Sequence, residues 1–421
     1  MKGISMQRFV LWTALLYTIV LDCSATLAGN KEDLLKELLT KGRSALQQKK
    51  YHAALDAFNR AIEADSQSHA AYYGRGIAYE NMGDHAKAIR DFSTAIQLRP
   101  EDPTSYIARA AVYQRTGDLD RAMTDISEVI RLDPNSAAAY VSRSAVYSAR
   151  KDYDRAIADA SEAIRLDKEY AGAYSNRSAA HCGKGNYDLA IADASEAIRL
   201  DPKLAGAYNN RSGAYCAKGD YDLAIADAGE AIRLAPRGAL GYLNRCAAYG
   251  SKGDYRRVVV DATRAIELDP KCTNAYSNRG RACRELGKLE DAIRDYTRAI
   301  ELDPKCADAY FNRADLRYRM GEFDKAIADC TEAIRLDPKH LLAYYDRGSA
   351  CYAKGDYDRA IADYTEAIRL DATDADAKHA LAYYARGCAY MKKGQEIEAE
   401  ADFAEAKKLG FNSTLWPPSP K

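Results

Sequence analysis

Residues 341–374 read LLAYYDRGSACYAKGDYDRAIADYTEAIRLDATD, and this stretch sets the pattern for most of the chain. At intervals of i, i+3, i+4 and i+7 stand Tyr344, Arg347, Gly348 and Cys351, which is the pattern of one face of a helix. Gly355 and Asp356 then interrupt the pattern. Glycine suits the left-handed residue that ends a helix, and aspartate is a good N-cap for the next one. A second apolar stripe follows, so the stretch predicts a helix, a tight turn and another helix.

The same unit recurs every 34 residues. Ten copies fill residues 35–374, five extra residues follow at 375–379, and an eleventh copy covers 380–413. Tyrosine occupies the fourth position of every copy except the first, and the eighth position is always small. The twentieth and twenty-seventh positions are alanine, with the exceptions of Val258 and Val129. The copies begin at residues 35, 69, 103, 137, 171, 205, 239, 273, 307, 341 and 380.

These positions resemble the tetratricopeptide repeat family, whose 34-residue pattern has an aromatic at position 4, small residues at 8, 20 and 27, and proline at 32. The resemblance covers about 380 of the 421 residues. It implies an all-α fold, a right-handed superhelical solenoid of helix-turn-helix repeats. The first helix of each repeat, helix A, would line a concave groove. Such solenoids bury their core between neighbouring repeats.

Both ends of the chain differ from the repeats. Lys2 and Arg8 precede the apolar run 9–21, and small and polar residues continue to residue 28, which is the pattern of a secretory signal peptide. The sequence therefore predicts a secreted or periplasmic protein. An uncleaved membrane anchor, or a lipoprotein acylated on Cys23, remains the alternative. The first and last copies are atypical, as caps are, and residues 414–421 are predicted to be disordered.

The composition excludes several classes of function. The chain has 61 basic and 61 acidic residues, so its net charge gives no reason to expect nucleic acid or an anionic membrane as partner. We find no phosphate loop, nucleophile motif or metal-ligand spacing, and we predict no enzyme, cofactor or metal. The cysteines recur at equivalent repeat positions, which should lie too far apart for disulfides, so most are expected to fill the core.

Two positions of the repeat change together. The first copy lacks both residues, whereas each of the other ten has arginine at position 7 and aspartate at position 23. Positions that change together within one chain should touch, so we predict a structural ion pair between the two helices of a repeat. The clearest examples are Arg245 with Asp261, Arg279 with Asp295, and Arg313 with Asp329.

Asparagines form a series at position 6 of five consecutive copies, which the family resemblance places in the groove. A carboxamide both donates and accepts, so it can bind the backbone of a peptide of any sequence. Some members of the family hold peptides with such a ladder. The alternatives are local hydrogen bonding and recent duplication of the repeat. The ladder residues are Asn176, Asn210, Asn244, Asn278 and Asn312.

Aromatic side chains gather at positions 5 and 12 of the last copies. Aromatic residues are common anchors of protein interfaces, so we predict that this aromatic cluster binds a protein or peptide partner. The alternative is that some of the rings pack against neighbouring helices. The cluster consists of Phe311, Tyr318, Tyr345, Tyr352 and Tyr384.

Together these patterns predict a non-catalytic scaffold that holds an extended peptide or a protein partner in the concave groove. The predicted signal peptide would place this assembly role outside the cytoplasm. The alternative function is a membrane-tethered structural spacer that organises an envelope complex, in which the N-terminal segment would be the contact with the membrane.

Overall fold

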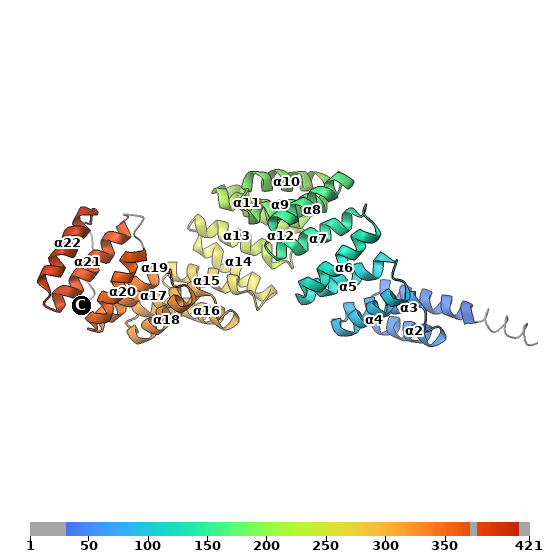
Figure 1. Cartoon of the computed structure of the whole chain (residues 1–421), viewed down its shortest axis with the longest axis horizontal. Helices are drawn as coiled ribbons and strands as arrows, with labels where there is room; N and C mark the ends of the chain where they lie inside the picture. The colour runs from blue at the N-terminus through green and yellow to red at the C-terminus, as the bar shows by residue number, and fades with distance from the viewer. Residues whose placement is uncertain (1–30, 371–376, 412–421) are drawn as a thin grey trace, which may run out of the picture. The chain divides into compact units, whose positions relative to one another are not determined.

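The computed structural model describes residues 31–370 and 377–411. Over these residues the chain forms helices joined by short turns, without a strand (Figure 1). The predicted all-α class is therefore confirmed. Residues 31–47 are helical. The helices that follow are α2 (Tyr51–Ala64), α3 (His69–Asn81), α4 (His85–Leu98), α5 (Pro103–Thr116), α6 (Leu119–Leu132), α7 (Ala137–Ala149), α8 (Tyr153–Leu166), α9 (Ala171–Gly183), α10 (Tyr187–Leu200), α11 (Ala205–Lys218), α12 (Tyr221–Leu234), α13 (Ala239–Ser251), α14 (Tyr255–Leu268), α15 (Thr273–Glu285), α16 (Leu289–Leu302), α17 (Ala307–Arg319), α18 (Phe323–Leu336), α19 (Leu341–Ala353), α20 (Tyr357–Leu370), α21 (Ala377–Lys392) and α22 (Glu396–Lys408).

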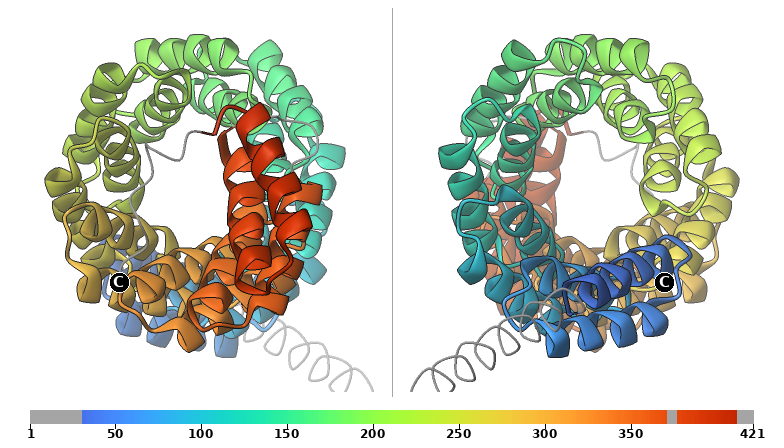
Figure 2. Two further views of the ribbon diagram at one scale, coloured as in Figure 1. Left: turned by 90° about the vertical axis from the view of Figure 1, so that its left-hand side faces the viewer. Right: turned by 90° about the vertical axis from the view of Figure 1, so that its right-hand side faces the viewer.

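The helices belong to two compact units, Met1–Asn210 and Arg211–Lys421, and α11 contains the boundary between them. From α2 to α10, and again from α12 to α22, each helix packs against the next one along the chain (Figure 2). From α3 onward, odd-numbered helices are helix A of a repeat and even-numbered helices are helix B. The helix-turn-helix repeats of the predicted solenoid are thus confirmed. Because α21 begins at Ala377, the last residues of the predicted insertion are helical.

The turns form as the sequence predicts. Gly117 ends α5 in the left-handed conformation, with φ of 81°, and Gly355 ends the turn after α19 with φ of 84°. The side chain of Asp118 accepts a hydrogen bond from the backbone N–H of Arg121 at 3.2 Å, which caps α6. The N–H groups that a helix start leaves unpaired are thereby partly satisfied.

Packing inside each repeat follows a size rule between positions 8 and 24. Gly76 faces the fully buried ring of Phe92, and a Cβ at Gly76 would lie 2.6 Å from a ring carbon. Where position 24 is alanine, position 8 has a larger side chain that fills the space. Ser144 is such a case: its hydroxyl donates to the carbonyl oxygen of Ala156 at 2.7 Å. The core therefore stays closely packed although individual repeats differ.

Several cysteines belong to this core. Cys246 and Cys330 are fully buried, and all nine cysteines of the described chain are free thiols. Cys246 occupies the same place as Ser144 does in its repeat, with its sulfur 3.5 Å from the carbonyl oxygen of Val258.

Within residues 31–370 and 377–411, no helix has the length and apolar character needed to cross a bilayer. The predicted signal peptide and C-terminal tail lie outside the described residues.

Candidate functional site

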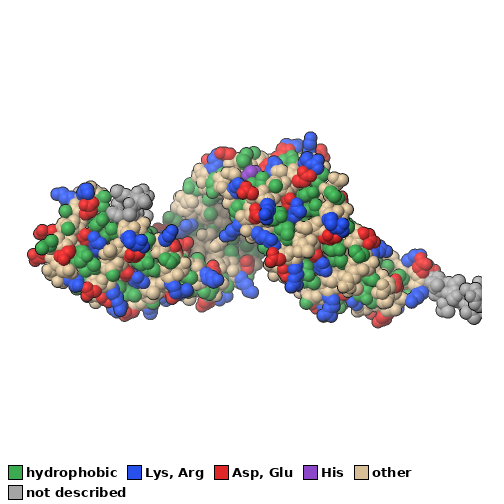
Figure 3. Space-filling model, in the orientation of Figure 1, with side chains coloured by type: hydrophobic (Ala, Val, Ile, Leu, Met, Phe, Trp, Pro, Cys, Tyr) green, Lys and Arg blue, Asp and Glu red, His purple; other side chains and the backbone are tan. Residues whose placement is uncertain are grey.

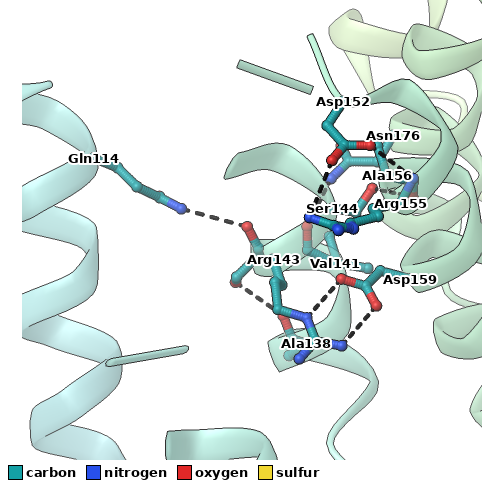
Figure 4. A network of polar contacts seen from close by, with 11 residues as sticks. Gln114, Ala138, Val141, Arg143, Ser144, Asp152, Arg155, Ala156, Asp159 and Asn176 are labelled. Carbon is teal, nitrogen blue, oxygen red and sulfur yellow. Dashed lines mark hydrogen bonds and ion pairs between the residues drawn. The ribbon is translucent and has the colours of Figure 1, made fainter. Parts of the chain in front are cut away.

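The structure brings together the arginines and aspartates that change together in the sequence. Arg245 donates from Nε to Oδ2 of Asp261 at 2.7 Å and from Nη2 to Oδ1 at 2.8 Å. Figure 4 shows the same two-pronged arrangement between Arg143 and Asp159. Paired donors of this kind suit the planar guanidinium and fix its orientation. The other two named pairs have the same geometry, Arg279 with Asp295 and Arg313 with Asp329.

Each of these arginines also makes contacts that the sequence analysis missed. The guanidinium carbon of Arg279 lies 5.7 Å from the ring centre of Tyr276, one turn earlier on the same helix. Its Nη1 donates to the hydroxyl of Thr263 at 3.2 Å, on helix B of the preceding repeat. Arg313 donates in the same way to Thr297. Serine or threonine recurs at position 25 of most repeats, and this was the sequence signal for the bond from arginine Nη1 to a hydroxyl of the preceding repeat.

Two ladder asparagines anchor themselves on the preceding repeat. The Nδ2 of Asn176 donates to the backbone carbonyl of Val141 at 3.0 Å (Figure 4). The Nδ2 of Asn210 donates to the carbonyl of Ser175 at 2.9 Å and lies 3.3 Å from its hydroxyl. Both carboxamides are half-buried, and in both the Oδ1 atom accepts no hydrogen bond from the described residues. Each is thus held in one orientation with an acceptor unused.

The other three ladder residues do not repeat this geometry. The Nδ2 of Asn312 donates to the backbone carbonyl of Asp308 in its own helix at 2.7 Å, and its Oδ1 accepts from Nη1 of Arg284 at 3.2 Å. Asn244 interacts with other residues of the chain. Asn278 makes no hydrogen bond within residues 31–370 and 377–411. Local hydrogen bonding, the alternative to a peptide ladder, therefore describes Asn312 best.

The rings of the aromatic cluster are half-buried, and each has a ring beside it. Tyr345 packs against Tyr364, with 5.5 Å between the ring centres, and burial raises its pKa well above the ordinary range. Tyr345 and Tyr352 both border a core formed by α19, α20 and α21. Part of the aromatic cluster therefore packs against the hydrophobic core and stabilises the fold. The remaining ring pairs are Phe311 with His340, Tyr318 with Phe323, Tyr352 with Tyr357, and Tyr384 with Phe403 and Phe411.

Charge is mixed on the face that Figure 3 shows, where Lys and Arg are interspersed among Asp and Glu. Exposed pairs within helix B are common; Arg165 with Glu162 is an example at 2.7 Å. The described part of the chain contains no group of three or more His, Cys, Asp or Glu residues placed to hold a metal ion.

Comparisons with known proteins agree with these repeats. A family model described as "Tetratricopeptide repeat" matches residues 39–103, 107–172, 180–239, 311–375 and 345–413, and one described as "TPR repeat" matches 280–321. A tetratricopeptide repeat protein from Parabacteroides merdae is 17% identical, with a TM-score of 0.53, over 59% of this chain and 99% of that chain. This likeness concerns the fold alone.

Two further similarities are weaker. The APC/C heterotetramer Cut9–Hcn1 is 15% identical, with a TM-score of 0.44, over 89% of this chain and 87% of that chain. The "Heat shock protein sti1 homolog" of Schizosaccharomyces pombe is 36% identical over 58 residues, which are 14% of this chain and 10% of that protein. The matched stretch is thus a small fraction of the curated relative.

Proposed function

Because this chain belongs to the tetratricopeptide repeat family, whose members are generally protein-interaction scaffolds, we propose that it holds an extended segment of a partner protein against its A helices. The activity is binding and not catalysis. Fold alone does not decide which partner a repeat protein binds, so the proposal rests on particular side chains.

The observation that carries the proposal is the orientation of Asn176 and Asn210. In each, one N–H of the carboxamide is fixed on the backbone of the preceding repeat, and Oδ1 accepts no bond from the described residues. An oriented acceptor loses little conformational freedom when a peptide N–H donates to it. A peptide bound in this way is held by its backbone, so its side-chain sequence can vary.

The aromatic cluster supports a second contact region in the C-terminal unit. Its rings are partly exposed, and packing against neighbouring rings keeps them in place. Rigid aromatic side chains provide a large contact area at a small entropic cost. In this proposal backbone binding belongs to α9 and α11, and side-chain recognition belongs to α17, α19 and α21.

The compartment is also part of the proposal. The N-terminal sequence, with an apolar run between basic and small residues, supports export of the protein and an assembly role outside the cytoplasm. Determining the N-terminal sequence of the protein isolated from cells tests this. A new N-terminus close to residue 28 supports export and cleavage, whereas an intact leader supports the membrane-tethered spacer.

The binding test compares immobilised wild type with the variant Asn176→Ala/Asn210→Ala. Both are exposed to extract from the cells that make the protein, and retained proteins are identified by mass spectrometry. We expect a partner that wild type retains and the variant loses. A matched control is Asn135→Ala, which removes an exposed carboxamide from the turn between α6 and α7.

Circular dichroism of each variant establishes that the helices are intact. If the double variant retains the same partner as wild type, the anchored asparagines are not the binding groups. If wild type retains no protein at all, the scaffold proposal itself is wrong for this chain.

A further inference from the structure

Asp346 on α19 has an unusual environment. It occupies position 6 of its repeat, where the five preceding repeats have asparagine. Its carboxylate has no hydrogen-bond or ion-pair partner among the described residues. The side chain keeps some exposure to solvent, yet protein surrounds it on most sides. A carboxylate in such a place normally has a partner, because an unpaired charge is costly to bury.

The neighbouring carboxylate, Asp315 on α17, is already paired. Its Oδ1 accepts from Nε of Arg319 at 3.0 Å, and its Oδ2 lies 3.8 Å from Nη1 of Arg284. That Oδ2 atom is inaccessible to solvent and accepts no hydrogen bond. The two arginines thus pair with Asp315. The charge of Arg319 opposes the burial of Asp346 only in part, and no cation of the described residues lies within ion-pair distance of the Asp346 carboxylate.

Two tyrosines of the aromatic cluster adjoin Asp346. Tyr345 precedes it on α19, and Tyr318 occupies the repeat position from which Arg284 reaches Asn312, the residue equivalent to Asp346, at 3.2 Å. After burial, the negative charge of Asp346 is the next largest cause that raises the pKa of Tyr318 and of Tyr345. Burial in turn raises the pKa of Asp346 to about 7; the charge of Asp315 adds to the shift and that of Arg319 opposes it. The site thus combines an unpaired acid with aromatic rings, and it favours anything that brings positive charge.

We propose that Asp346, with Tyr318 and Tyr345 beside it, takes the side chain of a lysine or arginine from the extended segment that the C-terminal unit binds. The inference rests on the proposed function and specifies one part of the ligand. An ammonium or guanidinium group would donate to the free carboxylate oxygens and contact the faces of the rings. The Asp346 carboxylate would gain the partner that the protein itself does not supply.

The same residues argue against other ligands. An anion would meet the unpaired carboxylate of Asp346. A metal ion would need several ligands, and no suitable group of them exists in the described ranges. A lysine or arginine side chain can bind to one carboxylate with aromatic rings beside it. On α17 and α19 these groups are Tyr318, Tyr345 and Asp346.

The test uses a phage-displayed library of random peptides, long enough to span several repeats, selected on immobilised protein. Wild type should enrich lysine or arginine at one position of the selected peptides. Asp346→Asn should lose this enrichment, and its affinity for a selected peptide should fall by roughly tenfold or more, as expected when a hydrogen bond to a charged group is lost. Asp346→Glu keeps the charge and should retain the preference.

The substitution Asp346→Asn is a mild one, because five other repeats of this chain have asparagine at this position. Asp358→Asn is the matched control: it removes the same charge from the same repeat, at an exposed carboxylate paired with Lys393. Its peptide selection should equal that of wild type.

The possible outcomes separate the two proposals. Peptides enriched by wild type without a basic position, or with a basic position that Asp346→Asn also selects, contradict the cation site and leave the scaffold proposal standing. A wild-type protein that enriches no peptide contradicts the scaffold proposal, and the cation site with it.

Discussion

Arg245 and Asp261 face each other across the two helices of one repeat, with Nε 2.7 Å from Oδ2 and Nη2 2.8 Å from Oδ1. The aspartate is 3% exposed, and the arginine side chain is 25% exposed. The ring of Tyr242 lies on the same helix, 6.0 Å from the guanidinium carbon. The pair is therefore a structural element of the repeat, largely withdrawn from solvent.

We expect Arg245→Leu to destabilise the protein by about 3–5 kcal/mol, because Asp261 would remain buried without a partner. Adding Asp261→Leu should restore part of the loss, so that a double-mutant cycle gives a clear coupling energy. Chemical denaturation followed by circular dichroism measures each free energy of unfolding. Strictly additive effects would show that the two side chains are not coupled.

A control for this cycle is the exposed pair of Lys252 and Asp222, which lie 2.6 Å apart between neighbouring repeats. Solvent screens such pairs, and each contributes about 1 kcal/mol or less. Lys252→Ala should therefore change the free energy of unfolding far less than Arg245→Leu does.

The size rule between positions 8 and 24 predicts a second set of effects. Gly76→Ser should destabilise by about 1–3 kcal/mol, because the new side chain meets the buried ring of Phe92. The double variant Gly76→Ser/Phe92→Ala copies the pair formed by Ser144 and Ala160, and it should recover part of that loss. Thermal melting compares the three proteins; a double variant no better than the sum of its single changes would refute the rule.

Asp346 should lower stability at high pH. Its folded-state pKa, raised to about 7 by burial, lies above the unfolded value near 3.8, so the folded state binds the proton more tightly. Stability therefore rises as the pH falls through about 7. At pH 8 we expect the free energy of unfolding of Asp346→Asn to exceed that of wild type by up to roughly 4 kcal/mol. This difference should be smaller at pH 5. Equal stability at both pH values would contradict this.

His69 should lower the stability of the protein at low pH, which is the opposite dependence. Burial lowers its pKa, and the nearby Asp102 carboxylate offsets this only in part. Its Nε2 lies 3.0 Å from the buried hydroxyl of Ser105. Because the unfolded chain binds the proton more tightly, stability is lost as the pH falls below about 6.5. Melting temperatures of wild type and His69→Gln between pH 8 and 5 measure this, and the variant should show the weaker dependence.

Cysteine reactivity gives a further test. Cys246 is fully buried, and burial raises the pKa of its thiol to about 12, so its thiolate is scarce near neutral pH. Cys272 and Cys306 are only half-buried. With iodoacetamide, mass spectrometry should find these two labelled well before Cys246 in the native protein. Equal labelling rates would show that the core around Cys246 opens readily.

The fold could be predicted because the repeats serve as their own comparison. Every copy after the first carries Arg and Asp at two fixed positions, so one chain is enough to infer a contact such as that of Arg245 with Asp261. Turns were equally predictable, since Gly117 must adopt a left-handed conformation that other residues resist.

The candidate site could be predicted only in part, because it depends on neighbours that differ between repeats. Asn176 and Asn312 occupy the same repeat position, yet only Asn312 has a long side chain, that of Arg284, within reach of its Oδ1. Tyr345 packs on the ring of Tyr364, a contact absent from repeats with alanine in that place. The free carboxylate of Asp346 follows from the whole set of surrounding groups and from no single position.

The third bond of the repeated arginines bears on how the chain responds to force. Arg279 and Arg313 tie their repeat to the preceding one through threonine hydroxyls, but Nη1 of Arg245 has no such tie because Gly229 occupies the corresponding place. Arg143 likewise makes only the two bonds to Asp159 within the described residues. Force applied to the two ends of the chain acts equally on every contact between neighbouring repeats. We therefore expect α6 to separate from α7, and α12 from α13, before the contacts between other repeats break. The chain would then extend in groups of repeats, and the separation would begin at these two junctions.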